Sequence, residues 1–221
     1  MTSIKEAFKD GNAFMPFTVA GYPDKKTSKE LIQTLVDSGA DIIELGVPFS
    51  DPLADGPTIM EADEKALEEG FVPNDVFDIA SEFPDTPIVI MAYANTLHAY
   101  GYEDFLRDAE AAGINGLIIP DMPPEEFEKE LGHIETSLDN IFLVTQNTPP
   151  ERVKKIGDKT EGFAYLVSVK GTTGARRDFA EKAESLIERT SSLEVPRAIG
   201  FGISSGEQAR KAVEVGSNGV I

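Results

Sequence analysis

The chain has 221 residues, no cysteine and a net charge of −19, from 39 acidic and 20 basic residues. The acidic excess disfavours nucleic-acid binding, which depends on Lys and Arg neutralising phosphates, and the lack of cysteine excludes disulfides, thiolate metal sites and cysteine nucleophiles from this sequence. Because there is neither a long apolar run nor the layout of a signal peptide, we expect a single cytoplasmic domain over residues 1–221, with no membrane contact.

In chain order, the first predicted element is a short helix from Ile4 to Lys9. Three further helices are predicted from apolar stripes at helical spacing, and each ends at a glycine suited to positive φ. Thr27 or Ser28 is expected to cap the first of these three. The three helices cover residues 27–38, 104–112 and 205–215.

Short apolar runs alternate with such helical segments along the whole chain. Strands that are apolar on both faces and alternate with helices are typical of a parallel sheet covered on both sides. Because no G-x-G-x-x-G follows the first strand, a dinucleotide-binding open sheet is disfavoured. We expect an α/β fold, a (β/α)₈ TIM barrel with the N-terminal helix at its bottom and truncation within strand 8 at Ile221. The expected strands are 15–20, 41–47, 87–92, 116–120, 141–145, 163–168, 197–201 and 218–221.

Glu44 is a carboxylate in an otherwise apolar strand, near the end where barrel enzymes carry their active sites. Burial there should raise its pKa and let it hold a proton near neutrality. The alternative is a structural glutamate paired with a base, but no Lys or Arg occurs between Asp41 and Lys65. We favour a catalytic role.

Other polar positions allow two interpretations each. Asp55, in LADGP, is a turn residue or a second functional acid. The glycine-rich loops after the sixth and seventh strands (171–174 and 200–204) form a phosphate cradle or are flexible connections. Phe17, Tyr93 and Tyr165 line a pocket or fill the core. The two histidines of the chain lack ligand spacing, so we expect no metal site.

Several motifs together resemble the tryptophan synthase α subunit family. The most specific is ELGVPFSDPLADGP at 44–57, and the others are PFTVAGYPD, MAYAN, GLIIPDMPPEE, YLVSVKGTTGAR and GFGIS. This resemblance implies a (β/α)₈ lyase that cleaves indole-3-glycerol phosphate to indole and glyceraldehyde 3-phosphate in tryptophan biosynthesis.

The resemblance also implies roles for individual residues. Glu44 would be the acid–base residue, and Asp55 would accept a hydrogen bond from the indole nitrogen. The loop from Lys170 to Arg177 would be a mobile lid. The remaining residues would bind substrate (Phe17, Tyr93, Tyr165 and Thr173) or its phosphate (Gly174 and Gly202).

The same resemblance implies a partner, the β subunit of an αββα complex, contacted through loops at the top of the barrel. It assigns pyridoxal phosphate to that partner and no cofactor to this chain. Two alternatives stay open: a stand-alone lyase that releases indole, and a weakened barrel that acts mainly by activating the β subunit. Because the family continues beyond strand 8 with a Gly-Ser pair and a helix, we expect a longer natural chain.

Overall fold

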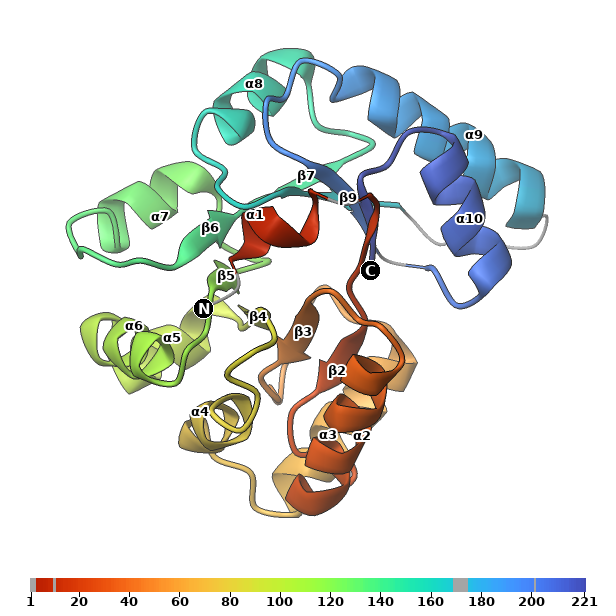
Figure 1. Cartoon of the computed structure of the whole chain (residues 1–221). Coiled ribbons are helices and arrows are strands. Elements are labelled where there is room, and N and C mark those ends of the chain that lie inside the picture. The colour runs from red at the N-terminus through yellow and green to blue at the C-terminus, as the bar shows by residue number, and fades with distance from the viewer. Residues whose placement is uncertain (1–2, 10, 169–174, 201) are drawn as a thin grey trace.

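A computed structural model describes residues 3–9, 11–168, 175–200 and 202–221. In this part of the chain, parallel strands form a closed barrel, and helices cover most of its outer face (Figure 1). The strands are β1 (Ala13–Phe14), β2 (Phe17–Val19), β3 (Ile43–Gly46), β4 (Ile88–Met91), β5 (Gly116–Ile118), β6 (Asp139–Ile141), β7 (Leu143–Thr145), β8 (Ala164–Val167), β9 (Arg197–Gly200) and β10 (Gly219–Val220).

Two interrupted strands join the two hydrogen-bonded sheets into one barrel. One sheet has the order β1-β10-β9-β8-β7 and the other β2-β3-β4-β5-β6. β1 continues into β2 past Pro16, which has no N–H to donate, and β6 continues into β7 past Phe142. Each broken strand therefore pairs with one sheet before its break and with the other sheet after it. The predicted single strands 15–20 and 141–145 are, in the structure, two such interrupted strands.

The helices lie between successive strands and differ from prediction mainly at their ends. Asp24 caps α2 by accepting a hydrogen bond from Thr27 N at 2.9 Å, so the predicted cap at Thr27 or Ser28 is wrong. The helices are α1 (Ile4–Ala7), α2 (Lys25–Asp37), α3 (Pro57–Glu68), α4 (Asn74–Ala80), α5 (Ala94–Tyr100), α6 (Tyr102–Ala111), α7 (Pro124–Glu130), α8 (Pro150–Gly157), α9 (Ala175–Arg189) and α10 (Gly206–Glu214).

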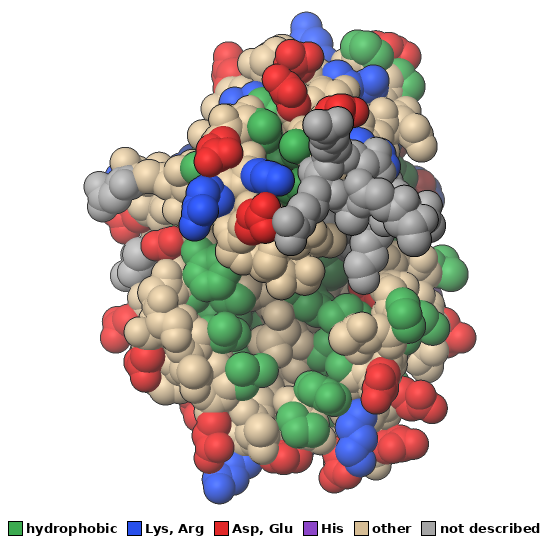
Figure 2. Space-filling model, turned by 90° about the vertical axis from the view of Figure 1, so that its right-hand side faces the viewer, with side chains coloured by type: hydrophobic (Ala, Val, Ile, Leu, Met, Phe, Trp, Pro, Cys, Tyr) green, Lys and Arg blue, Asp and Glu red, His purple; other side chains and the backbone are tan. Residues whose placement is uncertain are grey.

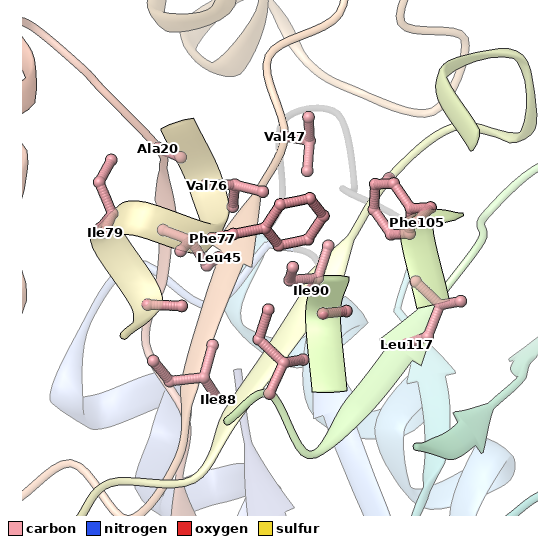
Figure 3. Close-up of a cluster of buried hydrophobic side chains, with 14 of the residues drawn as sticks. Ala20, Leu45, Val47, Val76, Phe77, Ile79, Ile88, Ile90, Phe105 and Leu117 are labelled. Carbon is pink, nitrogen blue, oxygen red and sulfur yellow. The ribbon is translucent and has the colours of Figure 1, made fainter. Parts of the chain in front are cut away.

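Alternate residues of each strand face the barrel interior or the helices. Leu45, Ile88 and Ile90 point outward into a cluster with helix side chains such as Phe77 and Phe105 (Figure 3). Their neighbours form a separate interior cluster, which includes Ile42, Val89, Ile118, Ile141 and Tyr165. Glu44 has the parity of Ile42, so its carboxyl group faces the interior.

Helix α1 covers the N-terminal ends of the strands. Ile4 belongs to the interior cluster and is 1% exposed. A Cβ added at Gly116, the first residue of β5, would lie only 2.8 Å from Ile4 Cδ1. The helix therefore plugs the bottom of the barrel, as predicted from the sequence.

One side of the barrel, at β1 and β10, has no covering helix among the described residues. Phe14 of β1 is 41% exposed and Leu31 of α2 is 38% exposed. Figure 2 shows hydrophobic side chains gathered over the middle of the face that lies on the right in Figure 1.

Candidate active site

Glu44 lies in β3 with its carboxyl group inside the barrel, and 2% of the residue is exposed. Within the described part of the chain, neither carboxylate oxygen has a hydrogen-bond partner. Burial, and then the charge of Asp55, raise its pKa to about 8. A carboxyl group in this setting is neutral at neutral pH and has a proton to donate.

Asp55 is held by Tyr93, which lies between β4, the next strand of the barrel, and α5. The Tyr93 hydroxyl donates a hydrogen bond to Asp55 Oδ2 at 2.7 Å and accepts one from Ala54 N at 3.0 Å. Burial raises the pKa of Asp55, while the hydrogen bond from Tyr93 acts in the opposite direction. The Asp55 carboxylate is therefore held in place by Tyr93, and its functional role stays a prediction.

Two of the predicted aromatic residues pack against glycines at the C-terminal ends of strands. A Cβ on Gly46 would come within 2.6 Å of the Phe17 ring, and one on Gly200 would clash with the ring and hydroxyl of Tyr165. Both glycines are needed because the rings pass directly over the backbone. Tyr165 belongs to the interior cluster, and burial, followed by the charges of Glu44 and Asp55, raises the pKa of its hydroxyl group.

The structure describes only part of the segment that is predicted to bind the substrate's phosphate group. Gly202 has φ +93° and lies just before α10, whose first turn is capped by Ser205 through Gln208 N. The N–H groups at such a helix start are a common anion site. Thr173 and Gly174 lie outside the described residues, as does most of the predicted lid. The phosphate role of Gly202 stays a prediction.

Two residues that the sequence prediction missed join this site. The Phe49 ring stacks on Tyr93, with 5.0 Å between centroids and 25° between planes. Asp63 of α3 is 4% exposed, and burial, followed by the Asp55 charge, raises its pKa to about 7. The sequence did contain a signal, because Asp63 falls on the apolar stripe formed by Ile59, Ala62 and Ala66.

Asp121 has a local structural role, since its Oδ1 accepts a hydrogen bond from Ala94 N at 2.9 Å at the start of α5. It also borders a cavity of about 390 Å³ that Ile119, Phe142 and Arg152 help to line. Glu44 does not line that cavity. Among the described residues there is no group of acids and histidines spaced to hold a metal ion, and none of their helices has the length and hydropathy to cross a membrane.

Comparisons with known proteins identify the family of this chain. A protein family described as tryptophan synthase alpha chain matches residues 4–221. The alpha chain of Methanoregula boonei is 45% identical over 100% of this chain and 86% of its own length, and that of Haloferax volcanii is 39% identical over 99% and 81%.

Solved structures are similar throughout the barrel. Tryptophan synthase of Mycobacterium tuberculosis matches with a TM-score of 0.90 and 36% identity, over 100% of this chain and 88% of that one. The tryptophan synthase a2b2 complex of Pyrococcus furiosus matches with a TM-score of 0.88 and 40% identity, over 95% and 86%. These matches confirm the predicted (β/α)₈ barrel. The chain belongs to the tryptophan synthase α-chain family.

Proposed function

We propose that this member of the tryptophan synthase α-chain family, a family of lyases in tryptophan synthesis, cleaves indole-3-glycerol phosphate by a retro-aldol reaction. The products are indole and glyceraldehyde 3-phosphate. The observation that supports this most is the Glu44 carboxyl group, which is buried in the barrel, lacks a partner among the described residues and has a pKa of about 8. The reaction needs a proton donor of this kind.

In the first step, Glu44 donates its proton to carbon 3 of the indole ring. This carbon becomes tetrahedral, and the positive charge that forms is shared with the ring nitrogen. Asp55, held by Tyr93, accepts the hydrogen bond from that N–H and stabilises the charge as it develops. The step therefore requires a neutral Glu44 and an ionised Asp55.

In the second step, the Glu44 carboxylate removes the proton of the glycerol hydroxyl group next to the ring. The O–H electrons form the aldehyde carbonyl, the C–C bond to carbon 3 breaks, and its electron pair neutralises the ring. The proton gained in the first step stays on carbon 3 of indole. Glu44 ends protonated, so the cycle balances without a co-reactant.

The remaining residues are proposed to position the substrate. Phe17 and Tyr93 would wall the indole ring, and Tyr165 would orient Glu44 or the substrate. Thr173, Gly174 and Gly202 would belong to the lid and phosphate end. No cofactor of this chain enters these steps.

We also propose a β chain as the partner, because the Pyrococcus furiosus relative is an a2b2 complex. In this chain Leu53 is 87% exposed at the tip of the loop that carries Asp55, so an apolar contact is available beside the site. The partner would hold pyridoxal phosphate, and we expect the complex to act in the cytoplasm.

The test is indole formation from indole-3-glycerol phosphate, measured with and without a β chain. Glu44→Gln removes the proton and keeps the shape, so turnover should fall by about 10²–10⁴-fold. The exposed Glu61→Gln on α3 serves as the control and should retain turnover. Substantial activity in Glu44→Gln would refute the assignment. A wild-type protein that activates the β chain without making indole would favour the weakened-barrel alternative.

A further inference from the structure

Phe49 is a partly buried aromatic residue in the loop of residues 47–56, which connects β3 to α3. Its ring lies nearly flat against the ring of Tyr93, with 5.0 Å between the ring centroids and 25° between the planes. Aromatic rings attract each other at this separation in stacked arrangements. The contact therefore joins the loop after β3, the strand that carries Glu44, to the start of α5.

The Tyr93 side chain also contacts the other end of this loop. Its hydroxyl group accepts a hydrogen bond from Ala54 N at 3.0 Å and donates one to Asp55 Oδ2 at 2.7 Å. Leu53, between the two points of contact, is 87% exposed. Phe49 and Asp55 are therefore held by one tyrosine, which contacts Phe49 through its ring and Asp55 through its hydroxyl group.

The backbone of Tyr93 is fixed at the start of α5. Its carbonyl accepts hydrogen bonds from Thr96 N at 2.9 Å and from Leu97 N at 3.4 Å. The next N–H along the chain, that of Ala94, donates to Asp121 Oδ1 at 2.9 Å. Because the backbone is fixed, only a rotation within the side chain can move the Tyr93 hydroxyl group.

The Phe49 ring opposes that rotation. A tyrosine hydroxyl lies on the axis that runs from Cβ through the ring, so it moves only when this axis tilts about the Cα–Cβ bond. Phe49 packs on one face of Tyr93, where it blocks a tilt toward itself, and a tilt away would lose the stacking contact. The stack therefore resists displacement of the Tyr93 hydroxyl from Asp55.

We propose that Phe49 is a positioning residue that fixes the Tyr93 ring and, through the Tyr93 hydroxyl group, sets the direction of the Asp55 carboxylate. This inference rests on the proposed retro-aldol function, in which Asp55 accepts the hydrogen bond from the indole N–H. Phe49 touches no reacting atom. What matters is a flat ring at position 49, so another aromatic residue should replace it and an aliphatic one should not.

Steady-state kinetics of the protein together with a β chain measure this effect. Asp55 acts on charge that develops in the transition state, so misplacing it should lower kcat more than it raises KM. For Phe49→Leu we expect kcat to fall about 3- to 10-fold with KM within about twofold of wild type. A raised KM with unchanged kcat would show that Phe49 binds the substrate directly, and would overturn the proposal.

Two further variants separate the ring from general packing. Phe49→Tyr keeps the ring and should stay within about twofold of wild type. Phe127→Leu is the matched control, because Phe127 of α7 is also partly buried and pairs with the ring of Phe142 at 5.5 Å; it should leave kcat and KM unchanged. A Phe49→Tyr enzyme as slow as Phe49→Leu, or an equal loss in Phe127→Leu, would overturn the role of the ring. If Phe49→Leu does not fold, Phe49→Met removes the flat ring for the same measurements.

A double-mutant cycle with Tyr93→Phe tests the route through the hydroxyl group. On that background Phe49→Leu should add no more than about a twofold loss in kcat, because the hydroxyl is already absent. Multiplied losses would overturn the proposal.

The pH profile gives a readout that a merely structural loss would not move. The hydrogen bond from Tyr93 lowers the pKa of Asp55, so Phe49→Leu should move the acidic limb of kcat/KM to higher pH. Phe127→Leu should leave that limb in place. An unmoved limb in Phe49→Leu would contradict the positioning role.

Amide hydrogen exchange at Ala54, followed by NMR, keeps this test distinct from the proposed function. The Ala54 N–H donates to the Tyr93 hydroxyl, so it should exchange faster in Phe49→Leu and near the wild-type rate in Phe49→Tyr. If wild type makes no indole, the proposed function fails, while exchange still tests whether Phe49 fixes Tyr93. Unchanged exchange in Phe49→Leu would overturn the positioning role even in an active enzyme.

Discussion

Replacing Glu44 with glutamine should stabilise the protein, by an amount that grows with pH. The folded protein holds a proton on Glu44 up to about pH 8, whereas an ordinary glutamate loses it near 4.5. Between these values the folded state binds more protons than the unfolded state, so the free energy of unfolding falls as pH rises. Glutamine fills the same space and does not titrate.

The size of the effect follows from the two pKa values. At about 1.4 kcal/mol per pKa unit, Glu44 lowers the stability by about 1 kcal/mol near pH 5 and about 4 kcal/mol near pH 8. The advantage of Glu44→Gln should therefore grow by about 3 kcal/mol between these two conditions. Because the residue is buried, screening by solvent does not reduce this figure.

Urea unfolding followed by circular dichroism measures the effect at both pH values. The exposed Glu61→Gln should change stability by less than about 0.5 kcal/mol at either pH. Equal slopes of free energy against urea would show that the unfolded states are comparable. If the advantage of Glu44→Gln is the same near pH 5 and pH 8, then Glu44 is not held neutral and the proton-donor argument fails.

Three further changes test other parts of the site. Tyr93→Phe removes the donor to Asp55, so kcat/KM should fall roughly tenfold or more. The acidic limb of its pH profile should also move to higher pH, because the hydroxyl lowers the pKa of Asp55; an unmoved limb would contradict the pairing. Gly200→Ala should cost about 1–3 kcal/mol in thermal or urea unfolding, because its Cβ meets the Tyr165 ring. Gly206→Ala, with no atom within 4 Å of its Cβ, is the matched control, and equal losses would refute the packing argument. Leu53→Asp should leave indole formation by the isolated protein intact and weaken its activation by a β chain, as titration with that chain would show. Undiminished activation would remove Leu53 from the proposed interface.

Much of the fold could be predicted from local pattern. Runs apolar on both faces, alternating with helices that end at glycine, indicated the parallel barrel. Alternation along the strand put Glu44 on the same face as Ile42, but only the structure showed that this face is the barrel interior. The predictions of a helix cap and of a strand's extent were wrong where two local sequence signals compete. Asp24 caps α2 in place of Thr27 or Ser28, and Pro16 breaks a strand that hydropathy alone shows as continuous.

The candidate site was less accessible to sequence reasoning, because its contacts join distant residues. The sequence left Asp55 open between a turn residue and a functional acid, and it gave no sign that the hydroxyl group of Tyr93, 38 positions away, donates a hydrogen bond to its carboxylate. Asp63 was hidden among the acids of an acidic chain, although its place on the apolar stripe of α3 distinguishes it. Only the tertiary structure shows which of those acids is buried.

The sequence by itself therefore determined the alternation of strands and helices, the family resemblance and the misplaced acid at Glu44. These depend on periodicity and on short motifs, which neighbouring residues specify. Closure of the barrel determined the other properties of the site. These are the burial of individual acids, the hydrogen bond from Tyr93 to Asp55 and the stacking of Phe49 on Tyr93. Such properties arise from contacts between strands and helices far apart in the chain, so they exist only in the tertiary structure.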